Sequence, residues 1–249
     1  MCTDCGCGPS GHHHHHHHAP GAQSQGRIVR VEEDLLAKNN RLAAENRRRF
    51  RDKGLLVYNL VSSPGSGKTT LLERTLNDLQ QELHFAVLEG DQQTSNDADR
   101  IAATGVPAVQ INTGSGCHLD AHMVGHGVEN FAALPLDILM IENVGNLDHE
   151  DIKRQGGKIS LLSVTEGEDK PLKYPDMFKA ADVLLLTKID LLPYLRFDIE
   201  QCKAFARQVN PRVRIFELSC QSGAGLPLWY DWLRQEMAAK RGVTRADLR

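Results

Sequence analysis

The sequence predicts an α/β protein built on a mostly parallel, seven-stranded sheet with helices on both faces. From residue 55 onward, short apolar runs alternate with amphipathic stretches of helical length. The runs are apolar throughout, which is typical of parallel strands that are buried on both faces and joined by helical crossovers. The first run also leads directly into a glycine-rich loop and then into a helical stretch.

The individual elements follow from the same pattern. Apolar runs predict strands at residues 55–61, 85–89, 108–112, 136–142, 159–164, 183–187 and 213–218. Amphipathic stretches predict helices at residues 70–81, 96–104, 199–209 and 227–240. Ligands of such sheets bind at the carboxyl ends of the strands, so residues that follow a strand are the candidates for function.

Composition divides the chain into three regions. Residues 1–26 are rich in Cys, His, Gly, Pro, Ser and Gln, which predicts a disordered arm unless metal ions order it. Residues 27–53 predict an amphipathic helix with acidic residues early and arginines late, ended by Gly54. This helix is interpreted as one that docks on the main domain, residues 54–249; the alternative is a separate partner-binding helix.

Bulk properties exclude several classes of protein. A formal charge of −3 and a pI near 6.5 give no reason to expect nucleic acid or an anionic membrane as a partner. No apolar run is long enough to span a membrane, and no secretory signal is recognisable. Six cysteines are too few for a disulfide framework in 249 residues, so metal ligands or free thiols in a reducing cytoplasm are expected.

A phosphate-binding loop follows the first predicted strand. The run Ser62-Ser63-Pro64-Gly65-Ser66-Gly67-Lys68-Thr69-Thr70 stands between a strand and a helix, as such loops require. Lys68 is expected to reach the β- and γ-phosphates, and the Thr69 hydroxyl to bind Mg²⁺. Ser62 stands where the usual pattern has its first glycine, and the alternative is a chance turn. The predicted nucleotide-binding residues of the loop are Ser63, Gly65, Ser66, Gly67, Lys68, Thr69 and Thr70.

A base-reading segment is predicted after the strand at residues 183–187. In Thr187-Lys188-Ile189-Asp190, the aspartate can accept two N–H groups of guanine that adenine lacks, while the Lys188 stem covers the ring. The guanine-type pattern normally begins with asparagine, so Thr187 is a departure. The loop that begins at Ser219 is expected to support the base from the other side. GTP is favoured over ATP.

Two acidic strand ends are candidates for work on Mg²⁺ and water. Asp91 follows the second predicted strand, and Glu142 closes the fourth. A carboxylate near the γ-phosphate can bind Mg²⁺ or orient the attacking water. We assign Asp91 to water or metal and Glu142 to the Mg²⁺ shell, which with Lys68 gives the predicted catalytic set. The alternative for each acid is a helix cap or an exposed loop residue.

Thiols and imidazoles occur in two places. Cys117-His118 precedes His122 and His126, and in one helix the three histidines would share a face at i, i+4 and i+8. The N-terminal arm carries Cys2, Cys5 and Cys7, followed by the histidine run of residues 12–18. Thiolates and imidazoles are ligands for nickel(II) and zinc(II), between which the sequence does not decide. The histidine run is either native or a purification tag.

The residues resemble the HypB family, hydrogenase maturation GTPases that deliver nickel. The similarity covers nearly the whole chain beyond the arm, and Ser-Val-Thr-Glu-Gly-Glu-Asp-Lys-Pro-Leu-Lys-Tyr-Pro at residues 163–175 is its most specific part. The remaining similar segments are residues 1–8, 62–72, 89–94, 112–120, 141–147 and 187–194.

The resemblance implies a P-loop NTPase fold of the SIMIBI type and a GTPase that forms a homodimer with GTP. It implies one metal site at Cys2, Cys5 and Cys7, and a second at Cys117 and His118 that faces the same pair across the dimer. The implied partners are GTP and GDP, a nickel-binding accessory protein of the HypA type and the hydrogenase large subunit. Mg²⁺ and Ni²⁺ are the implied ions, with Zn²⁺ as an alternative at either transition-metal site.

One departure from the family pattern concerns the internal metal site. The family commonly continues Gly-Asn-Leu with a cysteine two residues later, whereas this chain reads Gly145-Asn146-Leu147-Asp148-His149. Either His149 or Asp148 replaces that ligand, or the site is weaker. An imidazole in place of a thiolate would also change the metal preference.

Two rival functions remain at this point. A urease-type nickel GTPase shares the fold, but it usually has Cys-Pro-His where this chain has Cys117-His118. A metal-storage or sensing protein, in which nucleotide is only structural, belongs to a different class. The favoured mechanism is that GTP–Mg²⁺ orders loops around Asp91 and Glu142, favours the dimer and couples hydrolysis to metal release. Intrinsic turnover should be slow, because no arginine finger is evident in the sequence.

Overall fold

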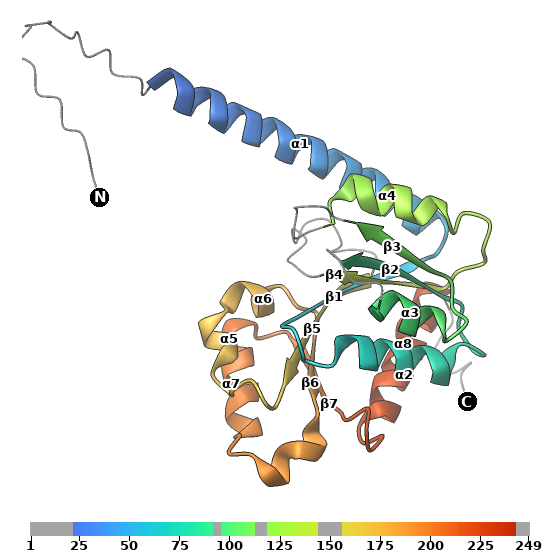
Figure 1. The fold of residues 1–249 in the computed structure, drawn as a ribbon, viewed down its shortest axis with the longest axis vertical. Coiled ribbons are helices and arrows are strands. Elements are labelled where there is room, and N and C mark those ends of the chain that lie inside the picture. Colours follow the sequence, from blue (N-terminus) through green and yellow to red (C-terminus); the bar gives the residue numbers. More distant parts are fainter. Residues whose placement is uncertain (1–21, 92–95, 113–118, 144–155, 243–249) are drawn as a thin grey trace, which may run out of the picture. The chain divides into compact units, whose positions relative to one another are not determined.

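The computed structural model describes the backbone of residues 22–91, 96–112, 119–143 and 156–242, and the side chains of 37–90, 97–111, 119–142 and 157–242. Strands alternate with helices along most of this length (Figure 1). The strands are β1 Leu56–Ser62, β2 Phe85–Asp91, β3 Ala108–Asn112, β4 Ile138–Asn143, β5 Gly156–Ser163, β6 Val183–Thr187 and β7 Arg214–Glu217. The helices are α1 Ala22–Asp52, α2 Lys68–Leu79, α3 Asn96–Ala102, α4 Ala121–Glu129, α5 Lys170–Lys173, α6 Pro175–Lys179, the 3₁₀ helix η2 Ile189–Tyr194, α7 Ile199–Val209 and α8 Leu226–Lys240.

The sheet has seven strands in the order β3-β2-β4-β1-β5-β6-β7, and every pairing is parallel. The predicted fold class is therefore confirmed. From β1 the chain continues to β2 on one side and later to β5 on the other, so β1 marks the point at which the strand order reverses. Crevices at such a point, beyond the carboxyl ends of the strands, are where these sheets bind ligands.

Helices cover both faces of the sheet, and alternate residues of the strands supply the two cores. On one face, α2, α3 and α8 pack over Tyr58, Leu161 and Leu185. On the other, α4 and the end of α1 cover β1 to β4, and α6 and α7 cover β5 to β7. Both faces of the sheet are covered by apolar side chains. The strands are therefore continuous apolar runs in the sequence, without an alternation of apolar and polar residues.

The long N-terminal helix ends where the sequence predicts. After Asp52, Gly54 adopts a left-handed φ of 65° and its N–H donates to the carbonyl of Arg51 at 2.9 Å. The chain divides into two compact units, Met1–Ala37 and Lys38–Arg249, so only the second half of α1 belongs to the larger unit. There Ala43 and Phe50 are buried. No helix in the described part of the chain is long and apolar enough to cross a membrane.

Several predicted boundaries were wrong. Helix α2 begins at Lys68 rather than at residue 70, and β5 begins at Gly156, three residues before its first predicted residue. Residues 170–179 carry two short helices, α5 and α6, that the sequence did not predict. Helix α4 begins at Ala121 because the side chain of Asp120 caps it, accepting a hydrogen bond from the N–H of Met123 at 2.7 Å. Helix α4 therefore includes His122 and His126, whereas His118 lies outside the described residues.

Candidate functional site

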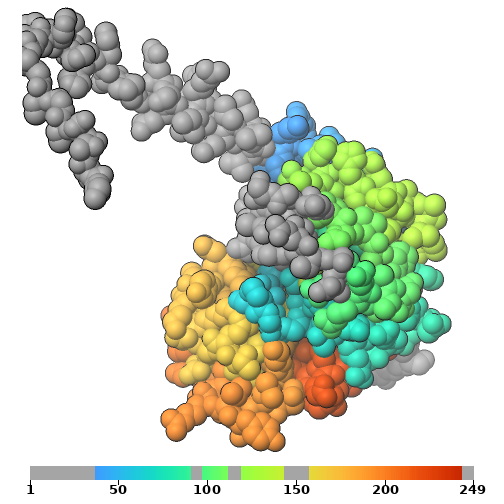
Figure 2. All heavy atoms as spheres, viewed as in Figure 1, coloured from blue at the N-terminus to red at the C-terminus, as the bar shows by residue number. Residues whose placement is uncertain are grey.

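The phosphate-binding loop has the backbone that its glycines allow. Gly65 and Gly67 adopt left-handed φ values of 75° and 94°, which other residues adopt only with strain. Helix α2 starts immediately afterwards, so Lys68, Thr69 and Thr70 form its first turn. The N–H groups at the start of a helix and the positive end of the helix dipole favour an anion here. Figure 2 shows this cyan segment at the surface beside the gold segment that carries α5 and α6.

A cavity of about 480 Å³ opens in front of the loop. Residues from three strand ends line it, together with α3 and the segment after β6. Beyond the loop residues 62–70, its lining consists of Glu89, Gly90, Asp97, Arg100, Glu142 and Lys188. The sequence predicted Glu142 and Lys188 in this place but not Glu89, Asp97 or Arg100.

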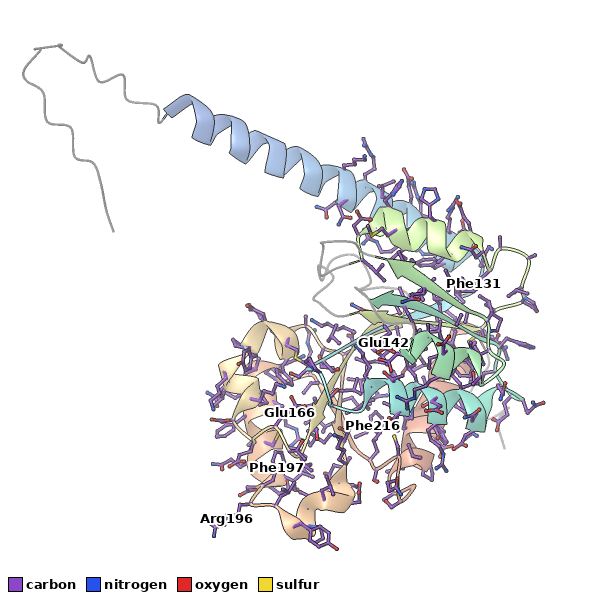
Figure 3. All side chains as sticks on the ribbon, viewed as in Figure 1. Phe131, Glu142, Glu166, Arg196, Phe197 and Phe216 are labelled. Carbon is purple, nitrogen blue, oxygen red and sulfur yellow. The ribbon has the colours of Figure 1, made fainter. Side chains whose placement is uncertain are left out.

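Glu142, at the carboxyl end of β4 (Figure 3), faces the phosphate loop. Its Oε1 lies 3.3 Å from Lys68 Nζ and accepts a hydrogen bond from Thr69 Oγ1 at 3.2 Å, while its buried Oε2 has no hydrogen-bond partner among the described residues. Burial raises the pKa of the Glu142 carboxyl, and the nearby Lys68 ammonium opposes that shift. A hydroxyl beside a carboxylate with a spare buried oxygen is a donor set that fits Mg²⁺.

Strand β2 carries two acidic residues near its carboxyl end, Glu89 and Asp91. Asp91 ends β2, but its side chain lies outside the described residues, so its assignment to water or metal stays a prediction. Glu89, two residues earlier, is buried, lines the cavity and pairs in register with Glu142 of β4. The parallel register thus brings two carboxylates to the same end of the sheet. Two acidic residues spaced two apart at the end of a predicted strand could have indicated that Glu89 also faces the site.

The predicted base-reading segment is attached to the phosphate loop. Thr187 is buried and donates from Oγ1 to the carbonyl of Ser66 at 2.6 Å, and Lys188 donates from Nζ to the carbonyl of Gly65 at 2.6 Å. Lys188 is also the one non-glycine residue with a left-handed φ, 61°, in the described part of the chain. Threonine in place of the usual asparagine therefore keeps a hydrogen bond between the two segments.

Asp190 and Ser219 lie farther from the cavity. Asp190 stands in the first turn of η2, and neither residue lines the cavity. Ser219 is buried, and its Oγ accepts a hydrogen bond from the N–H of Ser222 at 3.1 Å, which shapes the loop after β7. The two segments are adjacent, since the N–H of Ile189 donates to the carbonyl of Leu218 at 3.4 Å. Their predicted roles toward guanine stay predictions.

The sequence did not predict a partly buried ion pair beside the loop. Lys170 of α5 donates from Nζ to Ser63 Oγ and to Glu166 Oε2, and Glu166 Oε1 accepts from the N–H of Ser163 at 2.9 Å. Burial lowers the pKa of the Lys170 ammonium. Glu166 lies just beyond the end of β5 (Figure 3). These residues belong to the segment that carried the family resemblance, but its sequence does not indicate contact with Ser63.

Arg100 is a second cation that sequence reasoning missed. From α3 its Nη2 donates to Thr70 Oγ1 at 3.2 Å and to Glu73 Oε2 at 2.7 Å. Arg100 thus connects α3 to the first turn of α2 at the edge of the cavity. No local pattern distinguishes it from other exposed arginines on helices.

Most predicted transition-metal ligands cannot be placed. Cys2, Cys5, Cys7, Cys117, His118 and His149, with the alternative Asp148, lie outside the described residues. Within the described ranges, no group of three or more His, Cys, Asp or Glu side chains is arranged to hold a metal ion. His122 and His126 are described, and both are exposed on α4.

Comparison with known proteins decides the family. The family model for the CobW/HypB/UreG nucleotide-binding domain matches residues 56–217. The hydrogenase maturation factor HypB of Azotobacter chroococcum is 57% identical over 224 residues, which cover 89% of this chain and 73% of that protein. The chain belongs to the HypB family. It is thus a nucleotide-binding protein of the hydrogenase maturation factors, which confirms the resemblance seen in the sequence.

Solved structures agree with this assignment. HypB from Archaeoglobus fulgidus superposes with a TM-score of 0.74 at 37% identity, covering 81% of this chain and 99% of that one. HypB from Helicobacter pylori, solved in complex with nickel, has the same TM-score at 40% identity and covers 81% and 96%. The relatives compared are HypB proteins, so the chain is assigned to HypB rather than to UreG within the CobW/HypB/UreG family.

Proposed function

We propose that this protein is a Mg²⁺-dependent GTPase and nickel metallochaperone that helps insert nickel into the hydrogenase large subunit. The observation that carries the proposal is the contact of Glu142 with Lys68 and Thr69 in the lining of the cavity of about 480 Å³. Membership of the hydrogenase maturation factors supplies the biological task. The reaction is the hydrolysis of GTP to GDP and phosphate.

Each residue near the loop has a role in this reaction. The backbone of residues 63–67 wraps the β-phosphate, and Lys68 neutralises charge on the β- and γ-phosphates. Thr69 and Glu142 hold Mg²⁺, which when bound withdraws charge from the transferred phosphoryl group. Asp91 orients the attacking water. Arg100 and Lys170 position the loop through Thr70 and Ser63.

Guanine selection rests on the segment after β6. The Asp190 carboxylate accepts from the two N–H groups of the guanine edge, and the Lys188 stem covers the ring. The hydrogen bond from Lys188 to Gly65 supports this arrangement, because it holds the segment against the phosphate loop. The loop at Ser219 supports the base from the other side.

Nickel is the proposed cargo. Cys2, Cys5 and Cys7 of the arm form one site, and Cys117 and His118, with His149 or Asp148, form the other. Nickel bound to the Helicobacter pylori relative supports the choice of metal, whereas zinc remains a second candidate at the same thiolate ligands. The protein would act in the cytoplasm as a GTP-state homodimer, receive nickel with an accessory protein of the HypA type, and release it on hydrolysis.

The test separates this function from metal storage. Lys68→Ala removes the phosphate-loop cation, and we expect it to abolish GTP hydrolysis and hydrogenase maturation in cells while the arm still binds nickel. Lys53→Ala is a control, because this lysine only donates to the carbonyl of Ala132 at an exposed site. Full maturation with Lys68→Ala would refute the GTPase proposal and leave the storage or sensing alternative.

A further inference from the structure

An arginine of helix α3 stands at the edge of the phosphate cavity. Helix α3 lies beside the start of α2 (Figure 1), and Arg100 is among the residues that line the cavity. Its Nη2 donates to Thr70 Oγ1 at 3.2 Å and to Glu73 Oε2 at 2.7 Å. The two contacts fix the guanidinium at this edge, and its partial exposure leaves it accessible to a ligand.

Helix α2 holds the guanidinium of Arg100 by one nitrogen. Nη2 makes both of the hydrogen bonds to α2, while Nη1 lies 3.5 Å from Asp97 Oδ1 on α3 itself. A guanidinium carries its N–H groups in a planar fork, which matches two oxygens of one phosphate. The contacts to α2 therefore set the plane of the fork while they engage only its Nη2 end.

The described side chains that line the cavity are balanced in charge. The cationic ones are Lys68, Arg100 and Lys188, and the anionic ones are Glu89, Asp97 and Glu142. Lys68 lies 3.3 Å from Glu142 Oε1, and Lys188 donates to the carbonyl of Gly65 at 2.6 Å. The phosphates of a nucleotide add negative charge to this balanced lining. A further cation that reaches them lowers the electrostatic cost of binding.

The position of Arg100 points to one end of the nucleotide. Thr69 is buried and donates to Glu142, where we place Mg²⁺, whereas Arg100 binds the exposed Thr70. Successive residues of a helix face directions about 100° apart, so Arg100 approaches the start of α2 from a different side than Glu142 does. The backbone of such a loop cradles the α- and β-phosphates. Arg100 therefore belongs with these phosphates rather than with Mg²⁺.

We propose that Arg100 binds the α- and β-phosphates of the nucleotide through its guanidinium, and that Glu73 holds the guanidinium in position before the nucleotide binds. The ligand is thus the nucleoside diphosphate part that GDP and GTP share. The Nη2 contact to Thr70 keeps the fork beside the first turn of α2, while the charge of Glu73 competes with the phosphates for the same cation. The inference rests on the proposed function, in which a guanine nucleotide occupies the loop.

The test measures the affinity of the full-length protein for GDP by calorimetric titration without Mg²⁺, at several concentrations of NaCl. Arg100→Gln should weaken GDP binding by about 10- to 100-fold, because a charged hydrogen-bond donor to the phosphates is lost. A non-hydrolysable GTP analogue should lose affinity by the same factor. The dependence of GDP affinity on NaCl should be shallower in Arg100→Gln, since one charge fewer is screened, and Arg100→Lys should keep the dependence of the parent.

Two further variants separate contact with the nucleotide from a structural role. Glu73→Ala removes the carboxylate that ties Arg100 to α2, and alanine suits a helix. GDP should bind this variant at least as tightly as the parent, because the competing charge is gone. Arg234→Gln is the matched control, since Arg234 also bonds a glutamate, Glu82 at 2.7 Å and 3.0 Å, but does not line the cavity. It should change neither the affinity for GDP nor its dependence on NaCl.

Three results would overturn the contact. Equal GDP affinity in Arg100→Gln and the parent would exclude it. A loss in Glu73→Ala as large as that in Arg100→Gln would show that the arginine only ties α3 to α2. A loss confined to the GTP analogue would place Arg100 at the γ-phosphate. In each of these cases the parent still binds GDP and the proposed function stands, whereas a parent that binds no GDP would overturn both.

Discussion

Replacing Glu142 by glutamine removes one negative charge from the phosphate cavity with almost no change in shape. Its Oε1 lies 3.3 Å from Lys68 Nζ and 3.2 Å from Thr69 Oγ1, and the side chain is buried. The proposed Mg²⁺ position depends on this carboxylate. We expect Glu142→Gln to fold and to bind GTP without Mg²⁺ about as well as the parent, but to lose most of the Mg²⁺-dependent affinity and turnover.

The magnitude follows from the geometry. Two unit charges 3.3 Å apart attract by about 5 kcal/mol at an effective dielectric constant of about 20. Much of this is offset by desolvation, since burial is the larger influence and raises the pKa of the carboxyl. A double-mutant cycle of Lys68→Met and Glu142→Gln should therefore give a coupling energy of about 1–3 kcal/mol. For the doubly charged Mg²⁺ we expect a loss of about 100-fold in affinity, or about 2.8 kcal/mol.

The pH dependence gives a second, independent readout. Mg²⁺ requires the ionised carboxylate, so its affinity should fall as the pH is lowered through the raised pKa of Glu142, and should be flat in Glu142→Gln. The folding stability of the nucleotide-free protein depends on pH in the opposite direction from its affinity for Mg²⁺. A carboxyl with a raised folded-state pKa contributes stability that is fully present below the unfolded pKa and is lost as the pH rises through the folded pKa.

The assay is calorimetric titration of Mg²⁺ into protein saturated with a non-hydrolysable GTP analogue, across acidic to neutral pH. Glu82→Gln is the matched control, because Glu82 is exposed and binds only Arg234 at 2.7 Å and 3.0 Å. It should leave the affinity for Mg²⁺ unchanged. Equal Mg²⁺ affinity and an equal pH profile in Glu142→Gln and the parent would refute the assignment of this carboxylate.

Three further predictions follow from particular contacts. Lys170→Met leaves the partly buried Glu166 without its cation and should destabilise the protein by about 1–3 kcal/mol in urea unfolding. Glu166→Gln in the same chain should restore part of this loss, and additive effects would contradict the pair. Asp190→Asn should weaken GTP binding about 100-fold or more and should raise the affinity for xanthosine triphosphate relative to that for GTP, as measured by competition binding. An unchanged preference between the two nucleotides would show that Asp190 does not read the base. Gly225→Ala would place a Cβ against a carbonyl oxygen of β7, so this variant should unfold at a clearly lower temperature than Gly223→Ala. The Cβ of Gly223→Ala meets no atom, and this substitution should cost only about 1–2 kcal/mol of backbone strain. An equal loss of stability in the two variants would contradict the clash.

The fold was predictable because its signal is local. Each strand is a continuous apolar run, and the glycine loop marks the turn from β1 into α2. The ends of elements were less predictable, since they depend on caps and on neighbours. Helix α2 begins at Lys68 because Gly67 takes a left-handed conformation before it, a choice that side-chain periodicity does not record.

The site was predictable to the extent that its residues are consecutive. Lys68 and Thr69 follow from one motif, and Glu142 from its place at a strand end. The contact between Lys170 and Ser63 joins residues 107 positions apart, and no pattern along the chain connects them. Only the parallel register of β1 with β5 brings their segments together.

The histidines of α4 show that sequence spacing can also fail to predict where a helix begins. Their spacing predicted a common face for His118, His122 and His126. Helix α4, which carries His122 and His126, begins at Ala121 because the carboxylate of Asp120 takes the capping position, and His118 lies outside the described residues. An aspartate is a recognisable capping residue in a sequence, but several other polar residues nearby could also begin the helix.

The central claim is that the nucleotide state controls nickel binding. The most direct measurement is the nickel affinity and oligomeric state of protein lacking residues 1–21, compared with Mg²⁺–GDP and with a non-hydrolysable GTP analogue. The account predicts a dimer with tighter nickel binding in the presence of the analogue, and weaker binding with GDP. Equal affinity together with an equal oligomeric state in the two nucleotides would contradict it.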